Sequence, residues 1–186
     1  MIMSLFRRRS NLNRRIVDSA YASIVTAARN PVFYADWGVP DTPLGRYESV
    51  GLHMILFLYR TRGLEGAAEG LSQDVLDEFF KDVDHSIREL GVGDPSVPKR
   101  MKKLARMFYG RMGNYWKALD QGDTEALGEA IARNIVPETP DAIDRAAMAG
   151  YMVHAAEGLK QISDAELLTG VVRFPEPVVR SEGDHG

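Results

Sequence analysis

The spacing of apolar residues predicts α-helices along most of the chain. The first stripe lies between residues 13 and 29, where apolar side chains recur every three or four positions at Ile16, Ala20, Ile24 and Ala27. This is the spacing of one face of an α-helix, and Pro31 predicts its end. Comparable stripes predict further helices over residues 73–90, 98–119, 124–134 and 140–160, with a short helix that opens at Ser163.

The segment over residues 46–62 is different, because its middle, Val50 to Tyr59, is apolar on almost every side. A helix of this kind is usually buried all round. It is too short to cross a membrane, which needs about 20 apolar residues. We therefore predict that it is the central helix of a bundle. The loop before it, residues 36–45, holds two Pro and two Gly, and Asp41 or Thr42 is expected to cap the helix.

Other helix starts are predicted from residues whose side chains can cap a first turn. In chain order these are Ser72, Asp94, Asp123, Thr139 (followed by Pro140) and Ser163 (with Glu166 as its capping-box partner). After the last helix, Val171 to Phe174 is predicted to be extended.

Together these patterns predict an all-α fold, a single-domain bundle of about six to eight helices with an irregular C-terminal tail. The expected organisation is a basic and flexible segment over residues 1–12, a helical domain over residues 13–175 and a disordered tail over residues 176–186.

The charge distribution narrows the choice of partners. A formal net charge of −3 hides separate blocks. Residues 1–17 carry five Arg and no acid, residues 64–94 carry nine acids against two bases, and residues 95–117 carry seven bases and no acid. The last block predicts a basic face on the helix over residues 98–119. The first predicts weak, reversible contact with anionic membranes, made by Arg7, Arg8, Arg9, Arg14 and Arg15.

Several classes of function are excluded by what the sequence lacks. It has no Cys, which excludes disulfides, thiolate metal sites and cysteine nucleophiles. The N-terminus has no apolar stretch typical of a secretory signal, so we expect a cytoplasmic protein, peripheral at the inner face of the cytoplasmic membrane. The common nucleophile and phosphate-loop motifs are also absent.

Histidine and carboxylate spacing gives the only metal-like pattern. Asp82 with His85, and His154 with Glu157, have the three-residue spacing of ligands in di-iron bundles. The order of the second pair is reversed, and no further pair of inward carboxylates is evident. We therefore predict no metal, no cofactor and no enzymatic activity. His53, in the central apolar segment, is expected to be a hydrogen-bonded core residue.

Gly110 and Gly113 interrupt a strong helix on the side opposite its apolar stripe. Each costs about 1 kcal/mol relative to Ala in that position, so we expect another segment to approach the backbone there. Val171–Phe174 of the same chain and a helix of a bound client are the two candidates.

Two longer stretches combine aromatic, proline and charged residues in a distinctive order. The first has Ala28-Arg29-x-Pro31-x-Phe33-Tyr34 followed by Val39-Pro40-Asp41-Thr42-x-x-Gly45-Arg46-Tyr47-Glu48. The second runs from Phe80-x-Asp82-x-Asp84 through Arg88-Glu89-Leu90-Gly91-Val92-Gly93-Asp94 to Phe108-Tyr109-Gly110-Arg111. Both resemble the ubiquinol–cytochrome c chaperone family.

The resemblance implies a helical, non-enzymatic assembly factor of the cytochrome bc complex, here a bacterial member. Such a protein would bind newly made cytochrome b, act with a small partner assembly factor and associate with the exit region of the ribosome. No DNA partner is implied. The client-binding residues expected are Tyr34, Asp41, Thr42, Arg46, Tyr47, Asp84, Arg88, Asp94, Lys99, Lys103, Tyr109, Gly110, Gly113 and Arg111. A helical metal- or haem-binding protein and a membrane-surface adaptor are the alternative hypotheses.

Overall fold

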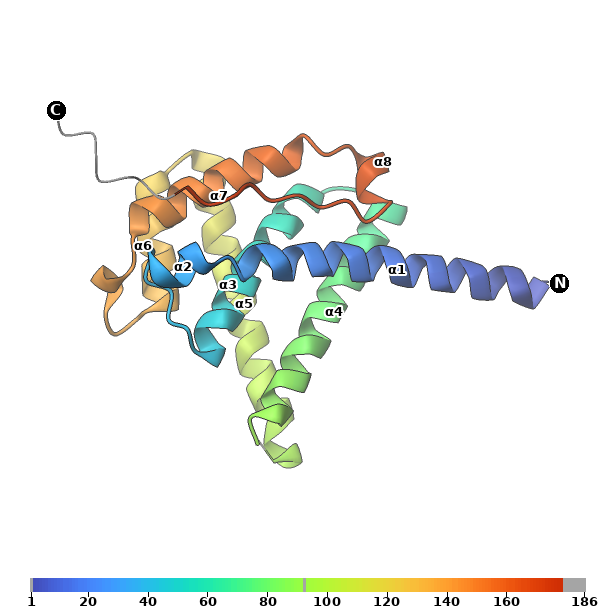
Figure 1. Ribbon diagram of the computed structural model, residues 1–186, viewed down its shortest axis with the longest axis horizontal. Helices are drawn as coiled ribbons and strands as arrows, with labels where there is room; N and C mark the ends of the chain where they lie inside the picture. Colours follow the sequence, from blue (N-terminus) through green and yellow to red (C-terminus); the bar gives the residue numbers. More distant parts are fainter. Residues whose placement is uncertain (1, 92, 179–186) are drawn as a thin grey trace.

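A computed structural model describes the backbone of residues 2–91 and 93–178, and the side chains from Asn13 onward except that of Asp94 (Figure 1). Within these residues the fold is all-α, with no strand. The elements in chain order are α1 (Ile2–Ala28), α2 (Pro31–Ala35), α3 (Pro43–Thr61), α4 (Ala67–Glu89), η1 (Asp94–Ser96), α5 (Val97–Gln121), α6 (Thr124–Ile135), η2 (Pro140–Ala142), α7 (Arg145–Lys160) and α8 (Asp164–Leu167). None of the described helices is long and apolar enough to span a bilayer.

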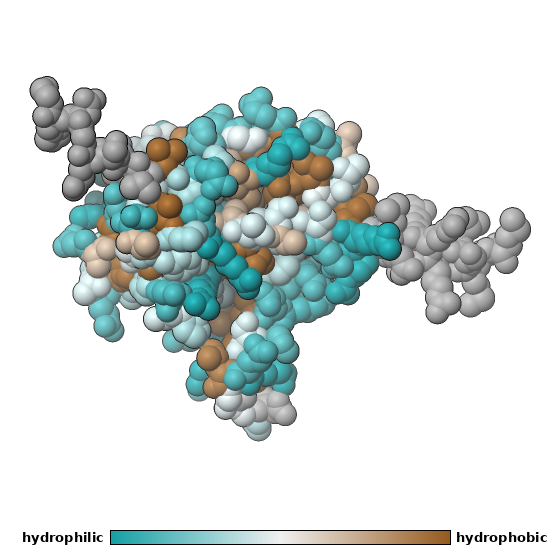
Figure 2. All heavy atoms as spheres, viewed as in Figure 1, coloured by the Kyte–Doolittle hydropathy of each residue, from teal (hydrophilic) through white to brown (hydrophobic). Residues whose placement is uncertain are grey.

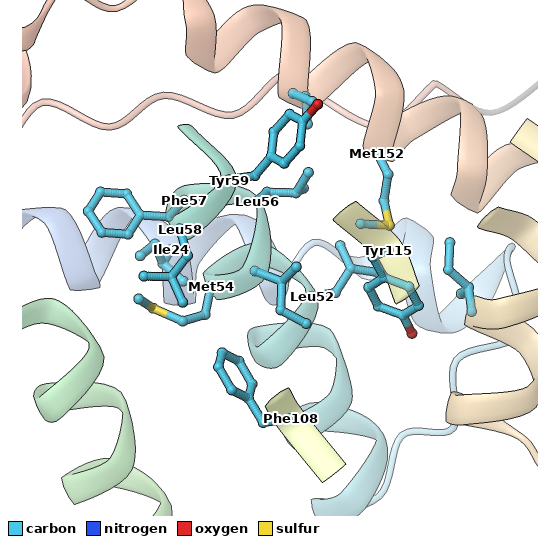
Figure 3. Packing of buried hydrophobic residues seen from close by; sticks show 14 of the residues in the cluster. Ile24, Leu52, Met54, Leu56, Phe57, Leu58, Tyr59, Phe108, Tyr115 and Met152 are labelled. Atoms are coloured by element: carbon cyan, nitrogen blue, oxygen red, sulfur yellow. The ribbon is translucent and has the colours of Figure 1, made fainter. Parts of the chain in front are cut away.

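Helix α3 lies at the centre of the bundle, as predicted. Its residues from Gly51 to Tyr59 are all buried, and α1, α4, α5 and α7 all pack against it. Figure 3 shows labelled side chains of α3 projecting in several directions, among Ile24 of α1, Phe108 and Tyr115 of α5, and Met152 of α7. The labelled α3 residues are Leu52, Met54, Leu56, Phe57, Leu58 and Tyr59. The all-round apolar pattern of the segment is thus explained by neighbours on every side.

The structure confirms some predicted helix starts and corrects others. The Oγ1 of Thr42 accepts a hydrogen bond from the amide of Gly45 and caps α3. Helix α1 begins at Ile2, earlier than the expected start at residue 13. Helix α4 begins at Ala67, not Gln73, because Ala68 and Leu71 are buried and extend its apolar face. Ser72 is therefore inside the helix.

The predicted caps at Asp94 and Thr139 are also wrong. Helix α5 starts after Ser96, preceded by the short η1 that includes Asp94. Pro140 opens only the short η2, and α7 begins at Arg145 with Asp144 as its cap. Between them Ile143 is buried in an extended conformation, and the amide of Asp144 donates to the carbonyl of Trp37. Burying Ile143 therefore interrupts the helix. The caps at Asp123 and Ser163 are as expected.

The C-terminal segment is extended, as predicted, and packs along α1 and α3. An added Cβ at Gly170 would lie 2.8 Å from the carbonyl oxygen of Ile16, so the strand-like segment passes close to α1. Phe174 packs edge-on against His53 with ring centroids 5.0 Å apart. The amide of the Asn30 side chain donates to Glu176 over 2.8 Å. Residues 179–186 of the predicted tail lie outside the described residues.

Helices α4 and α5 form an arm that projects from the body of the molecule (Figure 1). They meet at η1, and their residues near that end lie beyond the rest of the bundle. We call residues 79–107 of this hairpin the arm. Its apolar side chains lie among polar ones on the projecting part of the surface (Figure 2).

Truncating the centre of α3 should test the central role of this helix. Leu56 is fully buried, so Leu56→Ala is expected to lower the free energy of unfolding by about 2–5 kcal/mol. Urea denaturation measures the change. Leu44→Ala, at an exposed position of the same helix, is the control and should change stability by less than about 1 kcal/mol. Equal effects of the two substitutions would contradict the packing.

Candidate functional site

A groove of about 1670 Å³ separates the arm from the body. One wall is the C-terminal half of α4 together with the N-terminal half of α5. The other wall is formed by α1, α2 and the start of α3. The groove therefore lies between the two stretches of sequence that carry the family resemblance, residues 28–48 and 80–111.

The rims of the groove carry exposed leucines. Leu44, in the first turn of α3, has 53% of its surface exposed, and Leu90, at the end of α4, has 61%. Between them the lining includes Val50, Leu104 and Met107. Contiguous apolar surface of this kind, bordered by polar residues, is typical of a site that binds another molecule.

Two tyrosines of the groove have their hydroxyl groups bound to backbone carbonyls. The Tyr47 hydroxyl donates to the carbonyl of Leu104 over 3.1 Å, and the Tyr34 hydroxyl donates to the carbonyl of Ala28 over 2.9 Å. The Tyr47 ring also stacks on Phe79, with centroids 5.9 Å apart. Burial raises the pKa of both hydroxyls. Their rings are thereby fixed, and they offer an occupant mainly apolar surface.

The turn at the start of α3 requires a glycine at position 45. A Cβ at Gly45 would overlap the carbonyl oxygen of Pro40, so only glycine fits under the turn. Beside it, the Nε of Arg46 donates to Asp41 over 2.8 Å. This hydrogen bond lowers the pKa of the exposed Asp41 carboxyl. The turn and the ion pair together shape one rim of the groove.

The structure brings part of the predicted site together. Six of the predicted client-binding residues line the groove: Tyr34, Asp41, Thr42, Arg46, Tyr47 and Lys103. They come from stretches more than fifty positions apart in the chain, which the arm brings face to face.

The other predicted residues do not line the groove. Asp84 and Arg88 lie on another face of α4 and pair with each other over 2.7 Å. Lys99, Tyr109, Gly110 and Gly113 are exposed elsewhere on α5. Asp94 belongs to η1, and its side chain lies outside the described part of the chain.

Arg111 is a buried residue of the interior instead of a surface contact. Its Nη1 lies 2.5 Å from Oε2 of Glu48, and both side chains are less than a tenth exposed. The other terminal nitrogen, Nη2, donates to the carbonyl of Asn134 over 3.3 Å. This ion pair joins α5 to α3 and lines the same small cavity as Tyr47.

The second carboxylate oxygen of Glu48 has no hydrogen-bond partner among the described residues. It borders a cavity of about 10 Å³ lined also by Tyr47, Phe108 and Tyr115, which is close to the space one water needs. Burial raises the pKa of Glu48 to about 7, opposed by the charge of Arg111, which lowers it. The attraction between the two charges therefore only partly compensates for the free energy of removing them from water.

The two leucines, Leu44 and Leu90, are the functional candidates that the sequence analysis missed. Leu90 belongs to the apolar stripe of α4 and Leu44 stands alone between Pro43 and Gly45, so neither was separable from core residues by spacing. The tertiary structure exposes both.

No described segment of this chain covers Gly110 and Gly113, so the expectation that Val171–Phe174 does so is wrong. An added Cβ at either position would meet nothing within 4 Å, and the Val171–Phe174 segment packs on α1 and α3 instead. A client helix remains the other hypothesis for this face.

His53 is a core residue, as expected. Its Nδ1 lies 2.8 Å from the carbonyl of Ser49, and its Nε2 lies 2.8 Å from the hydroxyl of Tyr151. Burial lowers the pKa of His53 to about 4, so the ring is neutral at neutral pH. No group of three or more His, Asp or Glu side chains in the described part of the chain is placed to hold a metal ion.

A helical protein with an apolar groove bordered by charged residues is typical of the class of proteins that bind segments of other proteins. The family model described as ubiquinol-cytochrome C chaperone matches residues 35–174. The chain belongs to this family of chaperones.

A solved structure supports the same assignment. The crystal structure of the Cbp3 homolog from Brucella abortus is 50% identical in sequence to this chain and superposes with a TM-score of 0.87. The similarity covers 95% of this chain and 97% of the other. No curated protein sequence matches the chain significantly.

Removing Arg111 should make stability strongly dependent on pH. In the native protein the pKa of Glu48 is raised from 4.5 to about 7, so the folded state binds more protons between these values and stability falls as pH rises through this window. Arg111→Met removes the opposing charge and raises the pKa of Glu48 further. We expect a loss of about 3–5 kcal/mol at pH 8 and a much smaller loss at pH 5, measured by urea denaturation.

The double variant Glu48→Gln with Arg111→Met is the control for this experiment. It leaves no buried charge at the site, so most of the stability at pH 8 should return. A loss that is the same at pH 5 and pH 8 in Arg111→Met would contradict the role assigned to the Glu48 carboxylate.

Replacing the two open glycines by alanine should stabilise the protein. Because nothing in the described chain contacts an added Cβ at Gly110 or Gly113, the helix propensity of Ala acts alone. Gly110→Ala and Gly113→Ala should each raise the free energy of unfolding by about 0.5–1 kcal/mol. Gly45→Ala, which would overlap Pro40, should lower it. Destabilisation by all three would show that the glycine face is covered.

Proposed function

We propose that this chain is an assembly chaperone that binds newly made cytochrome b in the groove beside the arm and assists assembly of the ubiquinol–cytochrome c reductase complex. Family membership supports the general role. The groove is the observation that supports the binding site, because it combines a large open volume with apolar walls and exposed leucines.

The energetics of the groove suit a holding function. Leu44 and Leu90 are 53% and 61% exposed, so each gains about 1–1.5 kcal/mol when an occupant buries the exposed part. The fixed rings of Tyr34 and Tyr47 lose little further freedom on binding, since their hydroxyl groups are already bound. A client segment with exposed apolar surface would therefore be held without any catalytic step.

Further partners follow from the family resemblance alone. A small partner assembly factor and the exit region of the ribosome are proposed on that basis. We also propose that the arginines of residues 7–15 give weak contact with anionic lipid at the inner face of the cytoplasmic membrane. The first turns of α1 extend beyond the rest of the bundle (Figure 1), a position from which they could reach such a surface.

Polar substitution of the two rim leucines should abolish client capture and preserve the fold. In a variant with Leu44→Gln and Leu90→Gln we expect the affinity for cytochrome b to fall about thirtyfold or more, which corresponds to a loss of about 2 kcal/mol. The measurement is the amount of cytochrome b that co-purifies with the tagged protein from native membranes.

Val178→Gln is the matched control, since Val178 is 77% exposed and lies outside the groove. It should leave capture unchanged. Thermal unfolding of all variants should stay close to that of the unmodified protein. If cytochrome b still co-purifies in full with the double leucine variant, the groove is not the client site.

A further inference from the structure

The walls of the groove present two helical ridges that no other helix of the described chain fills. On α5 the lining residues are Arg100, Lys103, Leu104 and Met107, at positions i, i+3, i+4 and i+7. On α4 and at its end the exposed lining residues are Asp82, Ser86, Glu89 and Leu90, at i, i+4, i+7 and i+8. These are the spacings with which helices pack against helices, so the geometry suits a third helix laid along the arm.

The size of the groove limits how much of such a helix it can hold. A helix about 10 Å across that rises about 1.5 Å per residue occupies roughly 120 Å³ per residue. The groove volume of about 1670 Å³ therefore has room for about 14 such residues, or four turns. This is well below the ~20 residues that span a bilayer.

The charges of the groove are unequally paired. Among its acids, Asp41 is bound by Arg46, Asp82 accepts from the hydroxyl of Tyr21 over 2.7 Å, and Glu89 lies 3.2 Å from His85. Its bases Arg29, Arg100 and Lys103 have no carboxylate partner among the described residues. The lining thus holds four bases against three acids, and the acids Asp82 and Glu89 lie on α4. The two bases on α5, Arg100 and Lys103, are the ones placed to pair with acidic side chains of an occupant.

We infer that the groove binds an amphipathic α-helix of about 14 residues whose apolar side packs on Leu44, Leu90 and Leu104 and whose acidic side chains pair with Arg100 and Lys103. The inference rests on the proposed function only in treating the groove as the client-binding surface. It further assigns the chemical class of the segment: a short acidic amphipathic helix, as distinct from a uniformly apolar membrane-spanning one.

Peptide binding to the full chain tests the inference without cytochrome b. The probe is a fluorescent 14-residue peptide with Leu at i, i+3, i+4 and i+7 and Glu beside the leucines, and its twin has every Glu replaced by Lys. Fluorescence anisotropy should show binding of the Glu peptide and at least tenfold weaker binding of the Lys peptide. A central Pro in the Glu peptide should abolish binding, because it breaks the helix.

Charge reversal on α5 identifies the contact. Arg100→Glu with Lys103→Glu should weaken the Glu peptide at least tenfold and restore binding of the Lys peptide. Lys99→Glu with Lys102→Glu is the matched control, because these exposed residues lie on the same helix outside the groove. It should change either affinity less than threefold. Equal weakening by both pairs would overturn the inference, since general attraction to the basic helix would then suffice.

Other results would overturn it in different ways. Failure of the Glu peptide to bind, or equal binding of its Pro variant, would exclude a helical occupant. A dimer of the unmodified protein that dissociates on Arg100→Glu with Lys103→Glu, seen by sedimentation, would make a second copy the occupant. Peptide binding that persists while cytochrome b fails to co-purify would contradict the proposed function and support this inference.

Discussion

Burial of α3 on all sides is the constraint on which the rest of the structure depends. Because Gly51 to Tyr59 cannot face water, α1, α4, α5 and α7 must each supply an apolar face to cover them. Helix α3 has 19 residues, whereas α4 has 23 and α5 has 25. The two longer helices cover α3 and then continue past its N-terminal end. The arm and the groove beside it follow from this difference in length.

The buried Glu48–Arg111 ion pair is a polar contact between α3 and α5 within this apolar packing. It lines a small cavity together with Tyr47, whose hydroxyl is bound to the carbonyl of Leu104 on the arm. An apolar pair would meet less desolvation cost at this site. The ion pair adds a geometric requirement instead, because a charged contact between buried side chains depends on both distance and orientation. The pair thereby ties the position of the arm to that of the central helix.

The charged side chains of the arm differ between the side that lines the groove and the side that faces away from it. Asp84 and Arg88 satisfy each other on α4, away from the groove. Arg100 and Lys103 lie on the groove side of α5 without an acidic partner in the described chain, close to the apolar Leu104 and Met107. The basic residues of α5 appear uniform along the sequence. In the helix some of them line the groove and the others point outward. Only the groove-lining residues can select an occupant by charge and shape together.

The sequence by itself determined the local features. Apolar spacing predicted α3 as the central helix and His53 as a bonded core residue, and the residue types before α3 limited its cap to Asp41 or Thr42. Each of these features depends on neighbours a few positions away. Whether a residue is exposed depended on segments far along the chain. The stripe that placed Leu90 in the core could not show that α3 ends before reaching it, and the charge of Arg111 did not reveal that Glu48 lies opposite. Gly110 and Gly113 suggested a close neighbour, yet the Val171–Phe174 segment packs on α1. Tertiary structure decided these positions, because burial and ion pairing are set by which helices meet and where each one ends.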